Sequence, residues 1–288
     1  MNDIINAAFI QFKPEIADVE GNFAQVEKLF NQLMPETDLV VLPELCFTGY
    51  NFASRESILP FAESTDSSKT LDFLLKHAQK HGIYIISGFP ELDNNQNRKI
   101  FNSSMLVGPE GLVGTYRKIH LFGKEKYIFE PGEKFEVFDI ELPKSGINLK
   151  LGIMVCFDWI FPESWLILFH KGADVIAHCT NLVLPGQAQK AIPVMSMMHR
   201  IPVILANRYG TEAQFPVSSE DSELTFTGNS IISNAFGDVI ASAPESSDFI
   251  GYASLNLKHS KNKQITEQNN LITDRKHAVY LDNGIVAD

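Results

Sequence analysis

Three short segments of the chain carry side chains that together could break a covalent bond by nucleophilic attack. Glu44 follows one apolar run, Lys118 ends a second and Cys156 ends a third. A thiol can attack an electrophilic carbon, a carboxylate can take the thiol proton, and an ammonium group can stabilise the developing oxyanion. The three residue types therefore indicate hydrolysis through a covalent cysteine intermediate, provided that the fold brings them together.

Each residue alone has a simpler explanation. An isolated Glu44 would cap a loop, and Lys118 beside Arg117 would be a basic pair on the surface. A single cysteine is most often a core residue. Cys156, however, lies at a predicted strand-to-helix junction, where backbone N–H groups beyond the thiol can receive an oxyanion. A catalytic role for Cys156 requires a base from elsewhere in the chain.

The elements that position these groups are predicted from apolar periodicity. Helices separate some of the predicted strands, whereas other strands pair directly. This mixture predicts an α/β (α+β) fold, a four-layer αββα sandwich of two mixed sheets with outer helices. Strands are expected at 4–12, 39–42, 83–89, 101–108, 112–118, 135–140, 148–155, 175–178, 203–207, 230–233, 239–243 and 249–255, and helices at 22–34, 70–81, 162–170 and 188–200.

The predicted strands orient the candidate groups. Alternation along residues 112–118 places Tyr116 and Lys118 on one face and Arg117 on the other, so Lys118 is expected to point inward. Glu44 comes directly after the strand at 39–42, at the carboxyl edge of a sheet. Apolar neighbours would raise the pKa of Glu44 toward the working pH of a general base.

Composition limits the classes of function. The net charge of −11 over 288 residues argues against general nucleic-acid binding. No apolar run reaches the roughly 20 residues of a membrane span, and the start of the chain lacks a basic leader. The three cysteines, Cys46, Cys156 and Cys179, fit a reducing compartment. We therefore expect a cytoplasmic protein of one domain, 1–288, whose tail, 258–288, lies at a subunit interface or frays.

In this order and spacing, the three segments resemble the Glu–Lys–Cys signature of the nitrilase superfamily of carbon–nitrogen hydrolases. Glu44, Lys118 and Cys156 fall on its three catalytic positions. Residues 123–132 resemble the family's Glu-x-x-x-Phe-x-Pro-Gly stretch, which places Glu125 on its second, pocket-lining glutamate. Landmarks at 206–210 and 226–230 also match, and several motifs in order are far less probable by chance than one.

The resemblance implies a mechanism. Glu44 takes the thiol proton, gives it to the leaving amine and then activates water, while Lys118 and the Phe157 N–H bind the oxyanion. Glu125 is expected to orient Lys118 or the substrate, with His120 behind them. The resemblance also implies a homo-oligomer, and neither a cofactor nor a metal is expected. Cys156, His178, Cys179 and His199 lack the paired spacing of a zinc site.

The substrate is less well defined by the sequence. The expected lining consists of Tyr50, Phe52, Trp159, Phe161 and Asn181, and no arginine follows Cys156 to hold a carboxylate. Cys156-Phe157-Asp158-Trp159 also resembles the amidase and carbamoylase branches of the superfamily. Together these features favour a small, mostly neutral amide.

Two other functions stay open beside the amide. Cys156-Phe157-Asp158-Trp159 and residues 181–185 resemble relatives that act on short aliphatic nitriles, so a nitrilase is the alternative. A catalytically silent binding or scaffold relative is the alternative from another class. In one departure, Met198 and His199 occupy positions where relatives carry a Glu-Asn pair.

Overall fold

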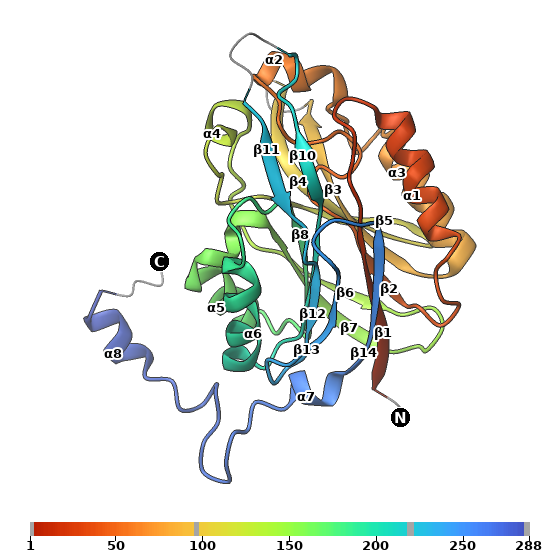
Figure 1. Cartoon of the computed structure of the whole chain (residues 1–288). Coiled ribbons are helices and arrows are strands. Elements are labelled where there is room, and N and C mark those ends of the chain that lie inside the picture. Colours follow the sequence, from red (N-terminus) through yellow and green to blue (C-terminus); the bar gives the residue numbers. More distant parts are fainter. Residues whose placement is uncertain (1–2, 95–97, 218–221, 285–288) are drawn as a thin grey trace.

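Two six-stranded sheets lie face to face in the computed structural model, which describes residues 3–94, 98–217 and 222–284 (Figure 1). The first sheet has the order β14-β1-β2-β3-β4-β5. Strands β1, β2 and β3 run parallel, and the remaining pairs are antiparallel. The bounds are β1 Ile4–Gln11, β2 Leu39–Val41, β3 Tyr84–Asp93, β4 Lys99–Gly108, β5 Gly111–Arg117 and β14 Phe249–Asn256.

The second sheet has the order β13-β12-β9-β8-β7-β6. Its centre, β7, β8 and β9, is parallel, and antiparallel strands complete both edges. Both sheets are therefore mixed, as the sequence predicts. The bounds are β6 Val137–Glu141, β7 Asn148–Val155, β8 Val175–Thr180, β9 Val203–Asn207, β12 Ile231–Ser233 and β13 Val239–Ser242.

Helices cover the outer faces of both sheets. On β1, Ala7 and Phe9 belong to the core between the sheets, whereas Ala8 and Ile10 pack under the helices α1 and α3. Trp165 of α5 lies in the core of the second sheet. The expected αββα sandwich is confirmed. The principal helices are α1 Val19–Phe30, α3 Lys69–His81, α5 Pro162–His170 and α6 Gln187–His199, and the shorter ones are α2 Arg55–Ile58, η1 Leu59–Phe61, α4 Glu125–Ile128, η2 Cys156–Ile160, α7 Leu257–Lys261 and α8 His277–Asp282.

Several predicted boundaries are wrong. Helix α1 starts three residues before the predicted Asn22, because Asp18 accepts a hydrogen bond from the Gly21 N–H and caps the helix earlier. Strand β3 continues past Phe89, because its pairing with β4 extends to Asp93 opposite Lys99. The hairpin of β10 Tyr209–Glu212 and β11 Leu224–Thr227 is absent from the predicted elements.

The segment after β14 leaves the sandwich and runs along its end to α8 (Figure 1). It is anchored by Lys263, whose Nζ donates to the carbonyls of His199 and Arg200 at the end of α6. Apolar side chains farther along it, including Ile272 and Val279, are exposed. Other parts of the segment also touch the body of the chain: Leu271 packs against the core between the sheets, and the ring of His277 lies 5.7 Å from that of His170 on α5. The predicted place of the segment at a subunit interface stays a prediction.

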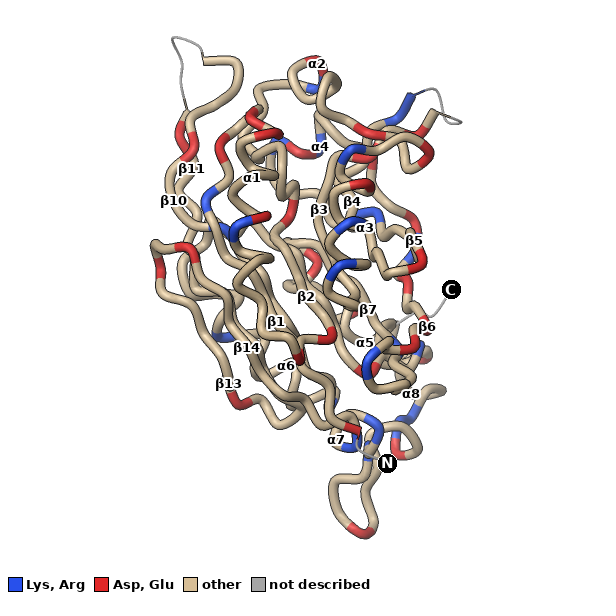
Figure 2. Tube along the Cα trace, turned by 90° about the vertical axis from the view of Figure 1, so that its right-hand side faces the viewer, with Lys and Arg blue, Asp and Glu red and all other residues tan. Residues whose placement is uncertain are grey.

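Charged residues of both signs are interspersed along the trace (Figure 2). Within residues 3–94, 98–217 and 222–284, no helix is long and apolar enough to cross a membrane.

Candidate functional site

Glu44 lies in a turn at the carboxyl end of β2, and its side chain is completely buried. The turn leaves the sheet sharply, with Leu45 in the left-handed region at φ 45°. Strand β3 passes directly behind it at Gly88, where a Cβ atom would lie 2.5 Å from the Glu44 Cα. Only glycine permits this approach, so the bare backbone of β3 fixes where the carboxylate stands.

Lys118 follows β5 and points inward, as predicted, with no exposed surface. Its Nζ donates to Glu44 Oε1 at 2.7 Å and to Glu125 Oε1 at 2.8 Å. Asn102 of β4 donates to the same Glu44 oxygen at 2.7 Å. Glu125 thus contacts the ammonium group of Lys118, and its expected role in orienting Lys118 or the substrate stays a prediction. Arg117, on the other face, pairs with Glu91.

Cys156 lies directly after β7, at the first residue of the short helix η2. Its backbone takes the left-handed region, with φ 43°, which costs a non-glycine residue free energy and marks functional turns. The ring of His178 holds the Cys156 carbonyl at 2.9 Å. The thiol approaches the Asn181 carbonyl at 3.9 Å, and Asn181 donates to the Glu44 carbonyl at 2.9 Å. Asn181 thus ties the thiol to the Glu44 turn.

The electrostatics of the site follow from burial and three charges. Burial raises the pKa of Glu44, and the nearby Lys118 opposes this rise. Burial and the Glu44 charge raise the pKa of the Cys156 thiol well above its usual range. Burial alone would favour a neutral Lys118, but the charges of Glu125 and Glu44 outweigh it and raise its pKa well above the usual range. Near neutral pH the amino group of Lys118 is therefore protonated and charged. The Cys156 thiol is also protonated, so it needs a base to remove its proton before it can attack.

One atom in the site is available to act as that base. Glu44 Oε1 already accepts from Lys118 and Asn102, whereas the buried Oε2 has no hydrogen-bond partner within the part of the chain that the structure describes. A buried carboxylate oxygen without a partner is unfavourable unless something in the working cycle occupies it. Oε2 is therefore the oxygen that can receive a proton.

The residues predicted to line the substrate site are distributed over two neighbouring cavities. Cys156 opens into a cavity bordered by Phe157, Trp159 and Asn181. Tyr50 and Phe52 border a second cavity, together with Glu125, whose carboxylate accepts from the Tyr50 hydroxyl at 2.5 Å.

Two of the predicted residues lie apart from both of these cavities. The rings of His120 and Phe161 stack on each other at 3.8 Å and border a third cavity next to Phe157. Phe161 is therefore not among the residues that surround the thiol cavity. The expected place of His120 behind Lys118 stays a prediction.

Asp158 connects the segment of Cys156 to that of Lys118, a role that the sequence does not predict. It is completely buried, and its carboxylate accepts from the Tyr116 hydroxyl at 2.7 Å and from the Val155 N–H at 2.9 Å. The other oxygen accepts from the backbone N–H of His120 at 3.2 Å and lies 2.8 Å from its ring. Tyr116 and His120 flank Lys118 by two residues on either side, so Asp158 sets the distance between lysine and thiol.

A second missed arrangement holds the Tyr50 loop. Arg208, completely buried, forms an ion pair with Glu212, which accepts from the backbone N–H groups of Tyr50 at 2.9 Å and Asn51 at 2.6 Å. The landmark at residues 206–210 contained the arginine, but its partner belongs to the unpredicted strand β10.

Met198 and His199 lie on the outer helix α6, away from both cavities. Met198 is exposed, and the ring of His199 donates a hydrogen bond to the Met195 carbonyl of the same helix at 3.0 Å. Among the described residues, no group of three or more His, Cys, Asp or Glu side chains is arranged to hold a metal ion.

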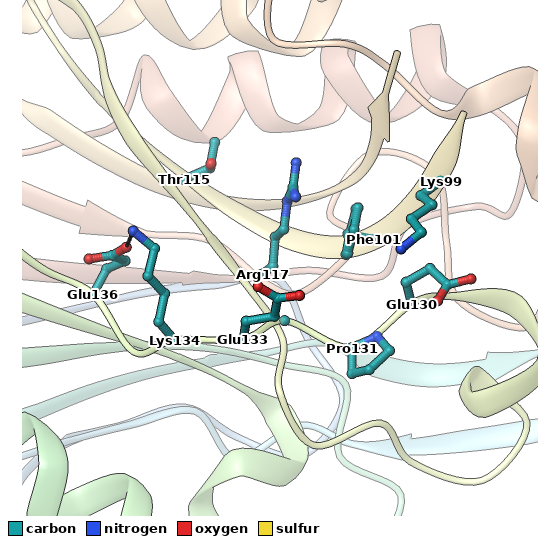
Figure 3. A pocket seen from close by; sticks show the side chains of 10 residues that line it. Lys99, Phe101, Thr115, Arg117, Glu130, Pro131, Glu133, Lys134 and Glu136 are labelled. Atoms are coloured by element: carbon teal, nitrogen blue, oxygen red, sulfur yellow. Dashed lines mark ion pairs between the residues drawn. The ribbon is translucent and has the colours of Figure 1, made fainter. Parts of the chain in front are cut away.

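A charged pocket on the outer side of β4 and β5 contains none of the predicted residues (Figure 3). Arg117 lies at its centre, 3.9 Å from the Phe101 ring centroid, and Lys134 pairs with Glu136. Because Arg117 and Lys118 point to opposite faces, this pocket is separated from Glu44 and Cys156 by the sheet.

The fold and the three converging side chains define a class of protein, and the comparison with known families agrees. Residues 6–262 match the family described as carbon–nitrogen hydrolase, and the chain belongs to this family, within the nitrilase superfamily.

Individual relatives include a nitrilase of Pyrococcus abyssi, 38% identical over 96% of this chain and 99% of the relative. An (R)-stereoselective amidase of a Pseudomonas species is 27% identical over 81% of this chain and 79% of the relative. The solved structure of a carbon–nitrogen hydrolase from Helicobacter pylori has a TM-score of 0.83 and 24% identity, covering 97% of this chain and 98% of that one.

Proposed function

We propose that this carbon–nitrogen hydrolase cleaves the non-peptide carbon–nitrogen bond of a small, mostly neutral amide through a thioester on Cys156. The observation that carries the proposal is the buried convergence of thiol, carboxylate and ammonium, in which Glu44 Oε2 has no hydrogen-bond partner among the described residues. In the first step, Glu44 takes the proton of the thiol as sulfur bonds to the amide carbon. Lys118 stabilises the negative oxygen that forms.

The rest of the cycle returns every group to its starting state. Glu44 passes the proton to the leaving nitrogen, the carbon–nitrogen bond breaks, and ammonia or an amine departs. Glu44 then takes a proton from water, whose oxygen attacks the thioester carbon. The carbon–sulfur bond breaks, the acid leaves, and the proton returns to the thiol. One carboxylate serves as base and acid in turn because its pKa is raised by burial.

A nitrile is the second candidate substrate. It is favoured by the 38% identity to the Pyrococcus abyssi nitrilase over almost the full length of both chains. The catalytic groups suit an amide and a nitrile equally, since a thiol can add to a nitrile carbon with the same base and cation. The Pseudomonas amidase and the neutral lining around Cys156 favour the amide.

The experiment compares matched amides, nitriles and N-carbamoyl amines, with ammonia and acid measured for each. Amides hydrolysed faster than the nitriles of the same acyl chain support the proposal, and the reverse order makes the chain a nitrilase. Mass spectrometry of the acid-quenched reaction is expected to show an acyl group on Cys156. The absence of both turnover and adduct with all three classes would contradict an enzymatic function and leave the scaffold alternative.

A further inference from the structure

We propose that the cavity beside Tyr50 and Glu125 is the acyl-chain pocket of the substrate and selects a short, uncharged apolar chain. This rests on the proposed function and names the part of the substrate that the thiol chemistry leaves undefined. The cavity measures about 210 Å³ and is bordered by Phe52, Ile128 and Leu224, among others. Its volume is below the roughly 300–1,000 Å³ of pockets that take larger ligands.

The pocket adjoins the reacting groups. Phe122 and Val183 border both this cavity and the cavity of Cys156, so the two spaces meet at these side chains. At the inner end, Glu125 contacts Lys118 at 2.8 Å. A carbonyl carbon at the thiol can therefore direct its attached chain past Phe122 and Val183 into the pocket.

Among the described residues that border the cavity, the buried polar side chains already have hydrogen-bond partners. The Tyr50 hydroxyl is used by Glu125, and Glu125 is used by Lys118. The Asn51 amide donates to the carbonyls of Glu212 and Ser222. Lys124, at the exposed rim, is the remaining charged residue among those that border the cavity. An ammonium or carboxylate group drawn inward would lose its water without a partner, which is unfavourable.

The apolar wall has several independent sources. Phe52 follows the Glu44 turn, Ile128 and Phe129 belong to α4 and its end, and Leu224 comes from β11. Phe52, Ile128 and Phe129 form a separate apolar cluster outside the two main cores. A rigid apolar wall of this kind rewards each added CH₂ group of a ligand that fits it.

The experiment measures kcat/KM for straight-chain amides from acetamide to octanamide, with 6-aminohexanamide as the charged analogue, and repeats the series with nitriles. We expect a rise of about three- to fourfold for each CH₂ until the pocket is full, then a fall. The 6-amino compound is expected to fall at least about 100-fold below hexanamide.

Variants of Leu224 test the location. Leu224→Trp fills the pocket and is expected to lower the hexanamide-to-acetamide ratio of kcat/KM at least tenfold, whereas Leu224→Ala is expected to move the optimum to a longer chain. Thr225→Trp, the neighbouring exposed residue on the other face of β11, is the matched control and should leave the ratio unchanged.

The outcomes separate the two proposals. Turnover of acetamide with no gain along the series, or equal turnover of 6-aminohexanamide and hexanamide, would overturn the acyl-chain pocket alone. A chain-length preference seen with nitriles and not with amides would support the pocket and overturn the choice of amide. No turnover of either series would overturn both.

Discussion

Lys118 donates a 2.7 Å hydrogen bond to Glu44, and neither side chain has any exposed surface. The pair joins two strands, since Glu44 follows β2 and Lys118 follows β5, at positions 74 residues apart in the chain. Glu125 supplies a second carboxylate to the same ammonium group. A site built in this way depends on each charge having its partners, because an unpaired buried charge is costly.

Replacement of Cys156 is expected to abolish turnover without unfolding the chain. Cys156→Ser keeps the size of the side chain, and Cys156→Ala removes a single atom from a cavity wall. We expect kcat to fall at least about 10³-fold in both, with circular dichroism and thermal unfolding close to those of the wild type. Cys179→Ser, on the buried strand β8, is the control, and near-normal hydrolysis by either Cys156 variant would exclude the thioester.

Replacement of Lys118 is expected to lower both rate and stability. Lys118→Met leaves Glu44 and Glu125 buried without their cation, so the free energy of unfolding should fall by about 3–5 kcal/mol. The rate should fall about 10²–10³-fold, the usual effect of losing one oxyanion donor. Urea unfolding and ammonia release measure the two effects. The variant that adds Glu125→Gln should recover part of the stability and none of the rate; recovery of the rate would contradict the role of Lys118.

Replacement of Asp158 is expected to affect kcat more than KM. Asp158→Asn keeps the shape but has one acceptor oxygen where two are used by Tyr116, Val155 and His120. A displacement of Lys118 relative to the thiol should lower kcat about 10²-fold, with KM nearly constant. The exposed Asp139→Asn on β6 is the control.

Alkylation of Cys156 by iodoacetamide provides a readout that needs no substrate. If Asp158→Asn changes the melting temperature and leaves both kcat and the pH profile of alkylation intact, then Asp158 is only structural.

Acid is expected to destabilise the fold through buried histidines. Burial lowers the pKa of His77 from 6.5 to about 4, and neither of its ring nitrogens has a hydrogen-bond partner in the described residues. The unfolded chain therefore binds the proton first, so this contribution to stability is complete above pH 6.5 and declines as the pH falls toward about 4. His178, which holds the Cys156 carbonyl, is also lowered to a pKa of about 4 by burial.

His77→Phe tests this dependence. His77 stacks on Phe30 at 4.6 Å, so a phenyl ring can take the same place. The slope of unfolding free energy against pH between 6 and 4.5 should decrease by up to about 1.4 kcal/mol per pH unit, the value for one proton. The exposed His259→Gln is the control, and an unchanged slope in His77→Phe would contradict the prediction.

Removal of residues 264–288 tests the predicted role of the tail at a subunit interface. Lys263 remains to bond the end of α6, and the exposed Ile272 and Val279 are lost. We expect a smaller assembly than that of the full chain when molar mass is measured by light scattering after gel filtration. Equal molar masses would contradict a tail-dependent interface.

The layers of the sandwich and the inward direction of Lys118 follow from local patterns. Alternation alone separates Lys118 from Arg117, and apolar runs give the central strands β1, β2, β7, β8 and β9. The start of α1 is not predicted, because it is set by the cap of Asp18 on the Gly21 N–H, whereas the prediction relies on the apolar periodicity that begins at Phe23. The strands β10 and β11 are only four residues long each, and neither contains a continuous apolar run that would reveal it.

The contacts of Asp158 and Glu212 lie beyond such patterns. Each belongs to a short segment whose partners come from distant parts of the chain: Tyr116 for Asp158, and the backbone of Tyr50 for Glu212. Only the packed sandwich brings these segments together. The resemblance to a known family indicates which residues are expected to react. The contacts that hold these residues in place form only in the tertiary structure.

Gly88 has no side chain and takes no part in the chemistry, yet its place behind Glu44 makes it as restrictive as a reacting residue. In a library of every single replacement scored for activity, position 88 should tolerate nothing, alanine included. The neighbouring Ser87, equally buried on the same strand, should accept small residues. The residue without a side chain is therefore expected to be the least replaceable position in this part of β3.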